Sequence, residues 1–149
     1  MSLIVDASVV IKWFVVEDLL DEADQLRPLI AELSAPDFLL VEIGNIAWKK
    51  TRQSILRPHD AARIVAHLRR SGMQLVPTTS LLDNALKLAQ DLDHPVYDCL
   101  YVALIEMLDT MFLTWDRQLY AKLSRSRFAS AAYLLSDVDR LLDRLNTPP

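Results

Sequence analysis

Four acidic residues of this chain stand where a carboxylate is unusual. Asp6 and Asp116 each come directly after a short apolar run, and Glu42 and Asp98 lie within two of the most apolar stretches. A carboxylate is rarely buried unless it is paired or holds a metal ion. Carboxylate oxygens are the ligands that Mg²⁺ and Mn²⁺ prefer. The four residues therefore predict a site for a hard divalent cation.

Each of these acids also has a structural explanation. Asp6 and Asp116 are typical turn residues, and Asp98 suits the positive end of a helix dipole. Glu42 could form an ion pair with a nearby lysine or arginine. Each explanation covers one residue, whereas a shared metal site accounts for four at once. The histidines, His59, His67 and His94, have no metal-ligand spacing, and we interpret them as structural or surface residues.

The elements that would position these acids alternate along the chain. Short apolar, β-branched runs predict strands at 2–5, 33–35, 74–76, 111–114 and 129–134. Apolar residues at helical spacing predict helices at 18–33 with a kink at Pro28, at 37–50, from 60 to 72, from 80 onward, at 96–108 and from 136 onward. Strands that alternate with helices indicate a parallel sheet covered on both faces. Ligands bind such sheets at the carboxyl ends of the strands, where Asp6 and Asp116 stand.

Helix boundaries carry their own signals. Asp60 is a candidate N-cap for the helix that Gly72 would end. Two further helices are expected to open with a capping box, formed by Ser80 with Asp83 and by Ser136 with Asp139.

Composition excludes several classes of protein. A chain of 149 residues fits one domain, with a core over about 3–135 and a C-terminal helix and tail over 136–149. Two glycines, Gly44 and Gly72, cannot form a glycine-rich phosphate loop. One cysteine, Cys99, excludes a disulfide framework and a multi-cysteine metal site. No apolar stretch is long enough to cross a bilayer, so we expect a soluble, cytoplasmic protein.

The net charge of −4 argues mildly against a nucleic-acid ligand. However, four of the twenty acids belong to the candidate site, and the remaining acidic residues equal the sixteen basic ones in number. Two basic clusters, Lys49-Lys50-Thr51-Arg52 and the residues Arg117, Lys122, Arg125 and Arg127, lie close in sequence to site acids and are candidate phosphate contacts. They could equally be solvated faces.

The order and spacing of these motifs resemble one family. Asp6-Ala7-Ser8, Glu42 with Asn45, His94-Pro95-Val96-Tyr97-Asp98 and Leu113-Thr114-Trp115-Asp116-Arg117 are similar to the motifs of PIN-domain ribonucleases, most of all the VapC-type toxins of bacterial toxin–antitoxin pairs. The likeness runs from Leu3 to about Leu135. It implies a three-layer α/β/α sandwich with a mostly parallel sheet. It also implies an endoribonuclease that depends on Mg²⁺ or Mn²⁺, forms a homodimer and is silenced by a cognate antitoxin.

The resemblance carries over to individual residues. Asp6, Glu42, Asp98 and Asp116 occupy the acidic, catalytic and metal-binding positions, and Ser8, Asn45 and Thr114 occupy the polar positions that support them. We expect Asp6 and Asp98 to be direct metal ligands. Glu42 and Asp116 would bind through water, or orient and deprotonate the attacking water. Ser8 has no histidine partner nearby in sequence, so covalent catalysis is not supported.

Other functions on a similar fold fit the sequence less well. A receiver-like signalling domain needs an acidic pair after the first strand and a lysine after the last, and both are missing. A D-x-D-x-T phosphatase fails because Ser8 stands at the second aspartate. A catalytically inactive binding module on the same fold remains the alternative, although it would have no reason to keep four buried like charges. The RNA that is cut, the number of metal ions and the antitoxin stay open.

Two surfaces are predicted for protein partners. Residues 13–20 contain Trp13, Phe14, Val15, Val16, Leu19 and Leu20, which predict an exposed apolar groove for an antitoxin helix. Surplus hydrophobic residues in 38–48 and 96–105, such as Trp48 and Tyr101, predict a homodimer interface. Trp115, between Thr114 and Asp116, is the best candidate for a contact with RNA.

Overall fold

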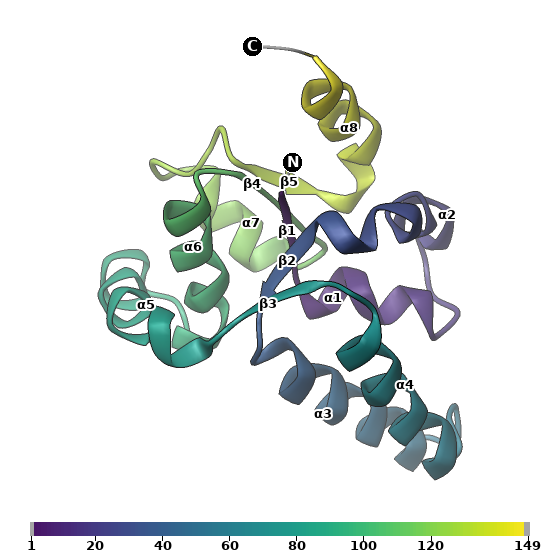
Figure 1. Cartoon of the computed structure of the whole chain (residues 1–149). Helices are drawn as coiled ribbons and strands as arrows, with labels where there is room; N and C mark the ends of the chain where they lie inside the picture. The colour runs from purple at the N-terminus through teal and green to yellow at the C-terminus, as the bar shows by residue number, and fades with distance from the viewer. Residues whose placement is uncertain (1, 148–149) are drawn as a thin grey trace.

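A five-stranded, entirely parallel sheet forms the centre of the molecule (Figure 1). The computed structural model describes residues 2–147. The sheet has the order β3-β2-β1-β4-β5, which confirms the predicted parallel sheet. Its strands are β1 (Leu3–Val5), β2 (Leu33–Pro36), β3 (Gln74–Val76), β4 (Met111–Thr114) and β5 (Ala132–Leu134).

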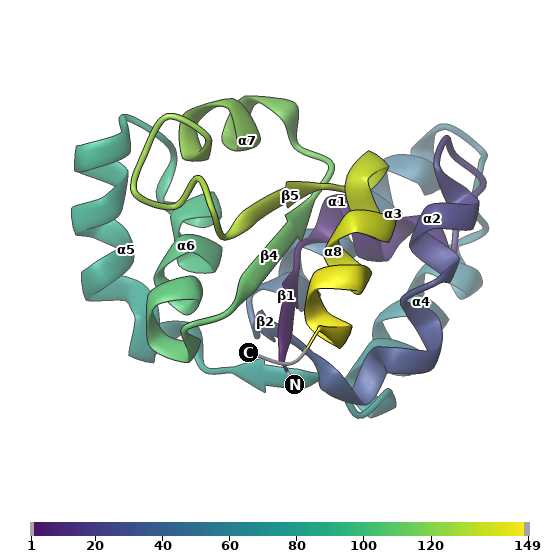
Figure 2. The same cartoon turned by 90° about the horizontal axis from the view of Figure 1, so that it is seen from above.

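Helices cover both faces of this sheet. They are α1 (Ala7–Val10), η1 (Ile11–Trp13), α2 (Leu20–Asp24), η2 (Arg27–Glu32), α3 (Leu39–Arg52), α4 (Pro58–Arg70), α5 (Thr78–Leu92), α6 (Val96–Leu108), α7 (Arg117–Leu123), η3 (Leu135–Asp137) and α8 (Val138–Asn146), where η marks a 3₁₀ helix. Figure 2 shows α5, α6 and α7 on one side of the strands and α1 to α4 on the other. The structure therefore confirms the three-layer α/β/α sandwich.

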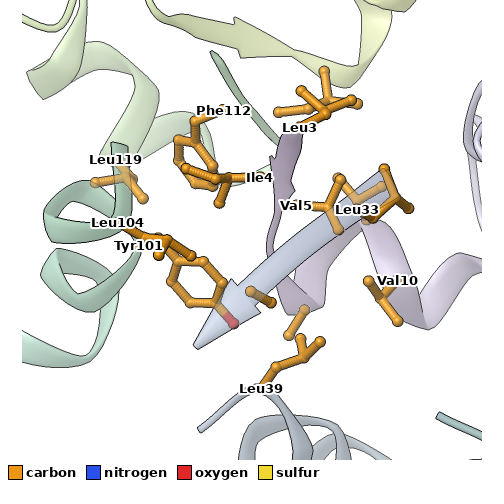
Figure 3. Packing of buried hydrophobic residues seen from close by; sticks show 14 of the residues in the cluster. Leu3, Ile4, Val5, Val10, Leu33, Leu39, Tyr101, Leu104, Phe112 and Leu119 are labelled. Carbon is orange, nitrogen blue, oxygen red and sulfur yellow. The ribbon is translucent and has the colours of Figure 1, made fainter. Parts of the chain in front are cut away.

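The core follows from the apolar runs. β1 is the central strand and is buried on both faces, as expected for a strand without alternation. α6 is buried from Cys99 to Ile105 and packs against the sheet. Figure 3 shows Tyr101 and Leu104 of α6 beside Phe112 of β4. This helix is thereby fixed firmly against the strands whose ends carry Asp6 and Asp116.

The register of β1 and β4 decides where the site acids lie. Val5 pairs with Leu113 in neighbouring parallel strands. Asp6 and Asp116 follow these strands, so both lie at the same edge of the sheet, where the strands end. This is the edge at which parallel α/β sheets bind ligands.

Several predicted boundaries were wrong. Residues 18–33 form α2 and the 3₁₀ helix η2 instead of one kinked helix, because Pro28 lacks a backbone N–H and begins a new segment near its N-terminus. The segment 117–123 forms the helix α7, which the apolar pattern did not predict. Two helices begin earlier than predicted: α4 begins at Pro58, so Asp60 lies in its first turn, and α5 begins at Thr78. The helix predicted at 37–50 is α3, Leu39–Arg52, and the strand predicted at 129–134 is limited to β5, Ala132–Leu134.

Capping was also predicted incorrectly. Neither expected capping box forms, since no side chain caps the N-terminus of α5 or α8. The signal that ends α4 was read correctly, because Gly72 has a φ of 85° in the left-handed region that favours glycine. The predicted tail Thr147-Pro148-Pro149 extends beyond the described residues at Pro148.

The N-terminal apolar segment is less exposed than predicted. Trp13 and Val15 are buried, and the Trp13 indole donates a hydrogen bond of 2.8 Å to the Ala23 carbonyl. Among the hydrophobic residues of 13–20, Val16 alone is strongly exposed, at 88%. Tyr101, predicted for a dimer interface, is 1% exposed and therefore belongs to the core. Among residues 2–147, every helix is too short or too polar to cross a lipid bilayer.

Candidate active site

Asp6 is held by residues from both neighbouring strand ends. It is 6% exposed and is the N-cap of α1, where its Oδ1 accepts hydrogen bonds from the backbone N–H of Ser8 at 3.1 Å and from the Ser8 hydroxyl. The Thr114 hydroxyl donates to Oδ2. Ser8 Oγ in turn accepts a bond from the Trp115 backbone N–H at 2.8 Å. Ser8 and Thr114 thus orient the Asp6 carboxylate, as the sequence analysis expected of supporting residues.

Asp116 begins the unpredicted helix α7. Its Oδ1 accepts bonds from the backbone N–H groups of Gln118 and Leu119 at 3.0 and 3.1 Å. Its own N–H donates to Thr114 Oγ1 at 2.9 Å. Both Asp6 and Asp116 are therefore helix N-caps, a structural role that differs from the turn residues considered in the sequence. The caps also fix the direction in which each carboxylate faces.

Glu42 lies in the first turn of α3 and bonds to the buried phenol of Tyr101. The Tyr101 hydroxyl donates to Glu42 Oε1 at 2.6 Å, and Figure 3 shows this hydroxyl pointing out of the core toward α3. Within the described residues no lysine or arginine pairs with Glu42. The ion-pair explanation considered for Glu42 is therefore wrong.

Asp98 lies in the first turn of α6, in the position that a helix dipole favours. His94 Nε2 lies 2.6 Å from Asp98 Oδ2. Since a carboxylate oxygen accepts, we assign the proton to Nε2. The His94 side chain is only 7% exposed, so this contact is largely shielded from water. His94, interpreted from the sequence as structural or surface, thus contacts a candidate ligand directly.

These side chains converge. Ligand atoms of His94, Asp98 and Asp116 all lie within 4.8 Å of one another. Asp6 interacts electrostatically with Asp98 and Asp116, and Glu42 with Asp6 and Asp98. The four residues Asp6, Glu42, Asp98 and Asp116, which we name the acidic cluster, are thus close in space although they are far apart in sequence.

The electrostatics of the acidic cluster are unfavourable without a cation. Burial, together with the neighbouring carboxylates, raises the pKa of Asp6 to about 6 against hydrogen bonds from Ser8 and Thr114. Burial, together with Asp6 and Asp98, raises the pKa of Glu42 to about 7, although the hydrogen bond from Tyr101 acts in the opposite direction. Burial also raises the pKa of Asp98. A bound cation would relieve this repulsion, because it neutralises the charges that burial and crowding disfavour.

A pocket opens beside the acidic cluster. It has a volume of about 390 Å³ and is lined by Phe38, Val41, Glu42, Asn45, Tyr97 and Asp98. Asn45 shares this pocket with Glu42, as expected from residues three apart on a helix. Within the described residues the Asn45 side chain makes no hydrogen bond to the carboxylates it was expected to support.

The basic clusters are only partly available to a ligand. Lys50 pairs with Glu17 at 3.0 Å, and Arg127 pairs with Glu106. Arg117 instead stacks on Trp115, with its guanidinium carbon 4.6 Å from the ring centroid. This Arg117–Trp115 pair lies next to Asp116 and is the best placed of the predicted phosphate and base contacts.

Four residues that contribute to this site were not predicted as site residues from the sequence. His94 stands four residues before Asp98, a spacing that could have suggested the contact. Tyr101 is separated from Glu42 by 59 positions, and no local pattern predicts that pairing. Phe38 and Tyr97 stack on each other at the pocket, which is equally a tertiary contact.

The comparisons with known proteins agree with this geometry. The chain matches the PIN domain family over residues 3–125, and it therefore belongs to the PIN domain family. It is 32% identical over 124 residues to Ribonuclease VapC3 of Pyrobaculum aerophilum, an alignment that covers 82% of this chain and 95% of that protein. Its fold is similar to the crystal structure of PAE2754 from Pyrobaculum aerophilum, with a TM-score of 0.70, 24% identity and coverage of 97% and 95% of the two chains.

Proposed function

We propose that this protein is a metal-dependent endoribonuclease and the toxin of a toxin–antitoxin pair. The observation that carries the proposal is the acidic cluster, whose carboxylates converge at the carboxyl ends of parallel strands without a lysine or arginine partner among the described residues. The PIN domain match and the similarity to a protein named Ribonuclease VapC3 support the same function. We also propose that the protein is cytoplasmic, where it would have access to an RNA substrate.

The donor set fits a hard divalent cation. Asp6, Asp98 and Asp116 would hold Mg²⁺ or Mn²⁺, with Glu42 contributing directly or through water, because carboxylate oxygens are the ligands these ions prefer. When bound, the cation would stabilise negative charge on the phosphodiester during hydrolysis.

The protein's own groups perform the remaining tasks. Ser8 and Thr114 keep the Asp6 carboxylate in one orientation. Tyr101 bonds to one carboxylate oxygen of Glu42 and leaves the other without this bond. A carboxylate oxygen held within reach of the reacting centre can accept a proton from an attacking water. We assign this general-base role to Glu42, with Tyr101 as its positioning residue.

RNA would approach along the rim of the site. Arg117 presents a guanidinium on the face of Trp115 beside Asp116, and Lys49 is exposed on α3. Such groups bind phosphates and stack on bases. The sum of these contacts would hold a single strand across the acidic cluster.

The proposed antitoxin would bind beside the N-terminal segment. A groove of about 650 Å³ between η1, η2 and α4 is lined by Trp13, Phe14, Arg27, Ile30, His67, Arg70 and Ser71. Its mixture of apolar and basic groups suits an amphipathic segment with acidic residues. Co-purification of the two proteins tests this, since Phe14→Ala should weaken the complex and Leu86→Ala on α5 should not. Equal retention of the antitoxin by both variants would contradict it.

We also propose a homodimer that uses α3. Trp48 is 52% exposed on this helix, and Arg52 stacks on its ring. Large aromatic residues of this exposure are enriched in protein interfaces. Light scattering at micromolar protein tests the dimer: the wild type should have twice the chain mass, and Trp48→Ala should shift toward the monomer. A monomeric wild type would contradict it.

Cleavage of a 5′-labelled single-stranded RNA tests the enzymatic function. We expect cleavage with Mn²⁺ or Mg²⁺ and none with EDTA. Attack by water leaves no 2′,3′-cyclic phosphate, whereas attack by the ribose 2′-hydroxyl does. Cyclic phosphate ends, or cleavage that persists in EDTA, would contradict the proposed chemistry.

A further inference from the structure

Two aromatic rings stack at the mouth of the pocket beside the acidic cluster. Phe38, the N-cap of α3, and Tyr97, in the first turn of α6, have ring centroids 5.6 Å apart and planes only 10° from parallel. Tyr97 is 58% exposed and the neighbouring Val41 is 61% exposed. The pair thus presents a flat, apolar, water-accessible face next to charged groups.

The polar groups of this pocket are available to a ligand. The Asn45 amide, which lines the same pocket, makes no side-chain hydrogen bond within residues 2–147. An amide carries both donors and an acceptor, so it can bind the edge of a nucleobase. Glu42 and Asp98 line the same pocket, and the proposed function places the scissile phosphate beside them.

We propose that Tyr97, Phe38, Val41 and Asn45 form a subsite for one unpaired nucleobase of the RNA, adjoining the phosphate that is cleaved. This subsite rests on the proposed ribonuclease function and names a determinant of its substrate. Unstacked bases of single-stranded RNA bind to aromatic faces and are read along their edges by polar side chains.

The size and charge of the pocket favour a base over a second copy of this chain. Its volume of about 390 Å³ is near the lower end of ligand pockets, which span about 300–1,000 Å³. A protein interface over the same pocket would bury Glu42 and Asp98 without a cationic partner, which is costly, so the homodimer proposed through Trp48 would have to leave this pocket uncovered. A nucleobase stacked on Tyr97 would cover the aromatic face and leave the two carboxylates accessible to solvent or to a cation.

Equilibrium binding of a fluorescein-labelled single-stranded RNA to the metal-free protein in EDTA measures this subsite without cleavage. We expect Tyr97→Ala to weaken binding about 10-fold, since stacking of one base is worth about 1–3 kcal/mol. Tyr97→Phe keeps the aromatic face and should bind within about 2-fold of the wild type. The control Leu86→Ala removes a side chain on α5 that is 53% exposed and should leave binding unchanged.

A series of abasic RNAs identifies the base that occupies the subsite. In each RNA of the series a different nucleotide is abasic. When the abasic site is at the position that occupies the subsite, the wild type should lose about as much affinity as the Tyr97→Ala variant loses on intact RNA. The Tyr97→Ala variant should lose little further affinity for that abasic RNA, because the abasic site and the substitution remove the same stacking contact.

Two results would overturn the subsite. Tyr97→Ala could bind intact RNA as the wild type does, or it could convert a dimer into a monomer in light scattering, which would assign the face to a second copy. Failure of the wild type to cleave RNA with Mn²⁺ would count against the proposed function instead, and binding in EDTA reports on the subsite independently of it.

Discussion

Two groups of carboxylates in this protein have opposite electrostatics. One group, which we name the paired cluster, consists of Lys12, Glu17, Asp18 and Lys50. Its Lys12 is only 1% exposed. Lys12 Nζ lies 3.2 Å from Glu17 and 3.0 Å from Asp18, and Lys50 lies 3.0 Å from Glu17. Every charge in this cluster has a partner.

The pKa values separate the two clusters. Burial raises the pKa of Glu17, but hydrogen bonds and charge from Lys50 and Lys12 outweigh it, so that the pKa lies below its usual value. In the acidic cluster burial is the largest cause, further carboxylates act in the same direction, and the hydrogen bonds to Asp6 and Glu42 do not outweigh them, so both pKa values rise. The sign of the shift therefore depends on whether cationic partners outweigh burial, as they do for Glu17. Lysines of the chain neutralise the carboxylates of the paired cluster, whereas the charges of the acidic cluster would be neutralised by a bound cation.

The largest expected effect is the loss of activity from the acidic cluster. Asp6→Asn keeps the size of the side chain but removes one candidate ligand charge, and cleavage with Mn²⁺ should fall by more than about 100-fold, because metal ligation supplies several kcal/mol of transition-state stabilisation. Glu17→Gln makes the same kind of change in the paired cluster and should retain wild-type cleavage. Rates on a labelled RNA check both, and equal losses would break the distinction between the clusters.

The same two substitutions should affect stability in the reverse order: Glu17→Gln should destabilise the protein, and Asp6→Asn should not. Without metal, Asp6→Asn removes a repelling charge and should melt at or above the wild-type temperature. Glu17→Gln leaves the buried Lys12 ammonium with one charged partner fewer and should lower the free energy of unfolding by about 2 kcal/mol. Urea unfolding in EDTA measures both. A large loss in Asp6→Asn with none in Glu17→Gln would reverse our assignment.

The raised pKa values also predict how stability depends on pH. For Asp6 at about 6 and Glu42 at about 7, the folded protein holds protons that the unfolded chain has already released above about pH 4. The free energy of unfolding therefore falls as the pH rises toward about 7, and metal-free protein should melt higher near pH 5 than near pH 8. Asp6→Asn and Glu42→Gln should each reduce this slope. A melting temperature that rises over the same interval is the contrary result.

A smaller effect is expected from Tyr101→Phe. The substitution keeps the ring that stacks on Phe112 and removes only the hydroxyl that bonds to Glu42. We expect kcat to fall by about 10-fold and the free energy of unfolding to change by no more than about 1 kcal/mol. If Tyr101 positions Glu42, the acid limb of the pH–rate profile should also move to higher pH. An unchanged rate would show that Glu42 does not need this bond.

The sequence was sufficient for the elements with long buried runs. The bounds of β4 and α6 were predicted correctly because each combines an apolar run with clear ends, and the four acids were selected as candidates because they interrupt or end such runs. The helix α7 was missed because it buries only Leu119 and Leu123, too few to give a periodic pattern.

The remaining errors arise from tertiary contacts. Trp13 was expected to be exposed, but its indole bonds to the Ala23 carbonyl and the ring is covered. The Tyr101–Glu42 bond joins α6 to α3, and the stacking of Phe38 on Tyr97 joins the same two helices. Such contacts depend on how the helices are placed against the sheet, which no local pattern specifies.

Melting of the metal-free protein during titration with Mn²⁺ tests the central claim most directly. If the acidic cluster is a cation site, Mn²⁺ binds only the folded form and stabilises it by about 2.7 kcal/mol at a hundredfold excess over Kd. We expect this rise for the wild type and for Glu17→Gln, and its loss in Asp98→Asn. An equal rise in Asp98→Asn, or no rise in the wild type, would contradict the account.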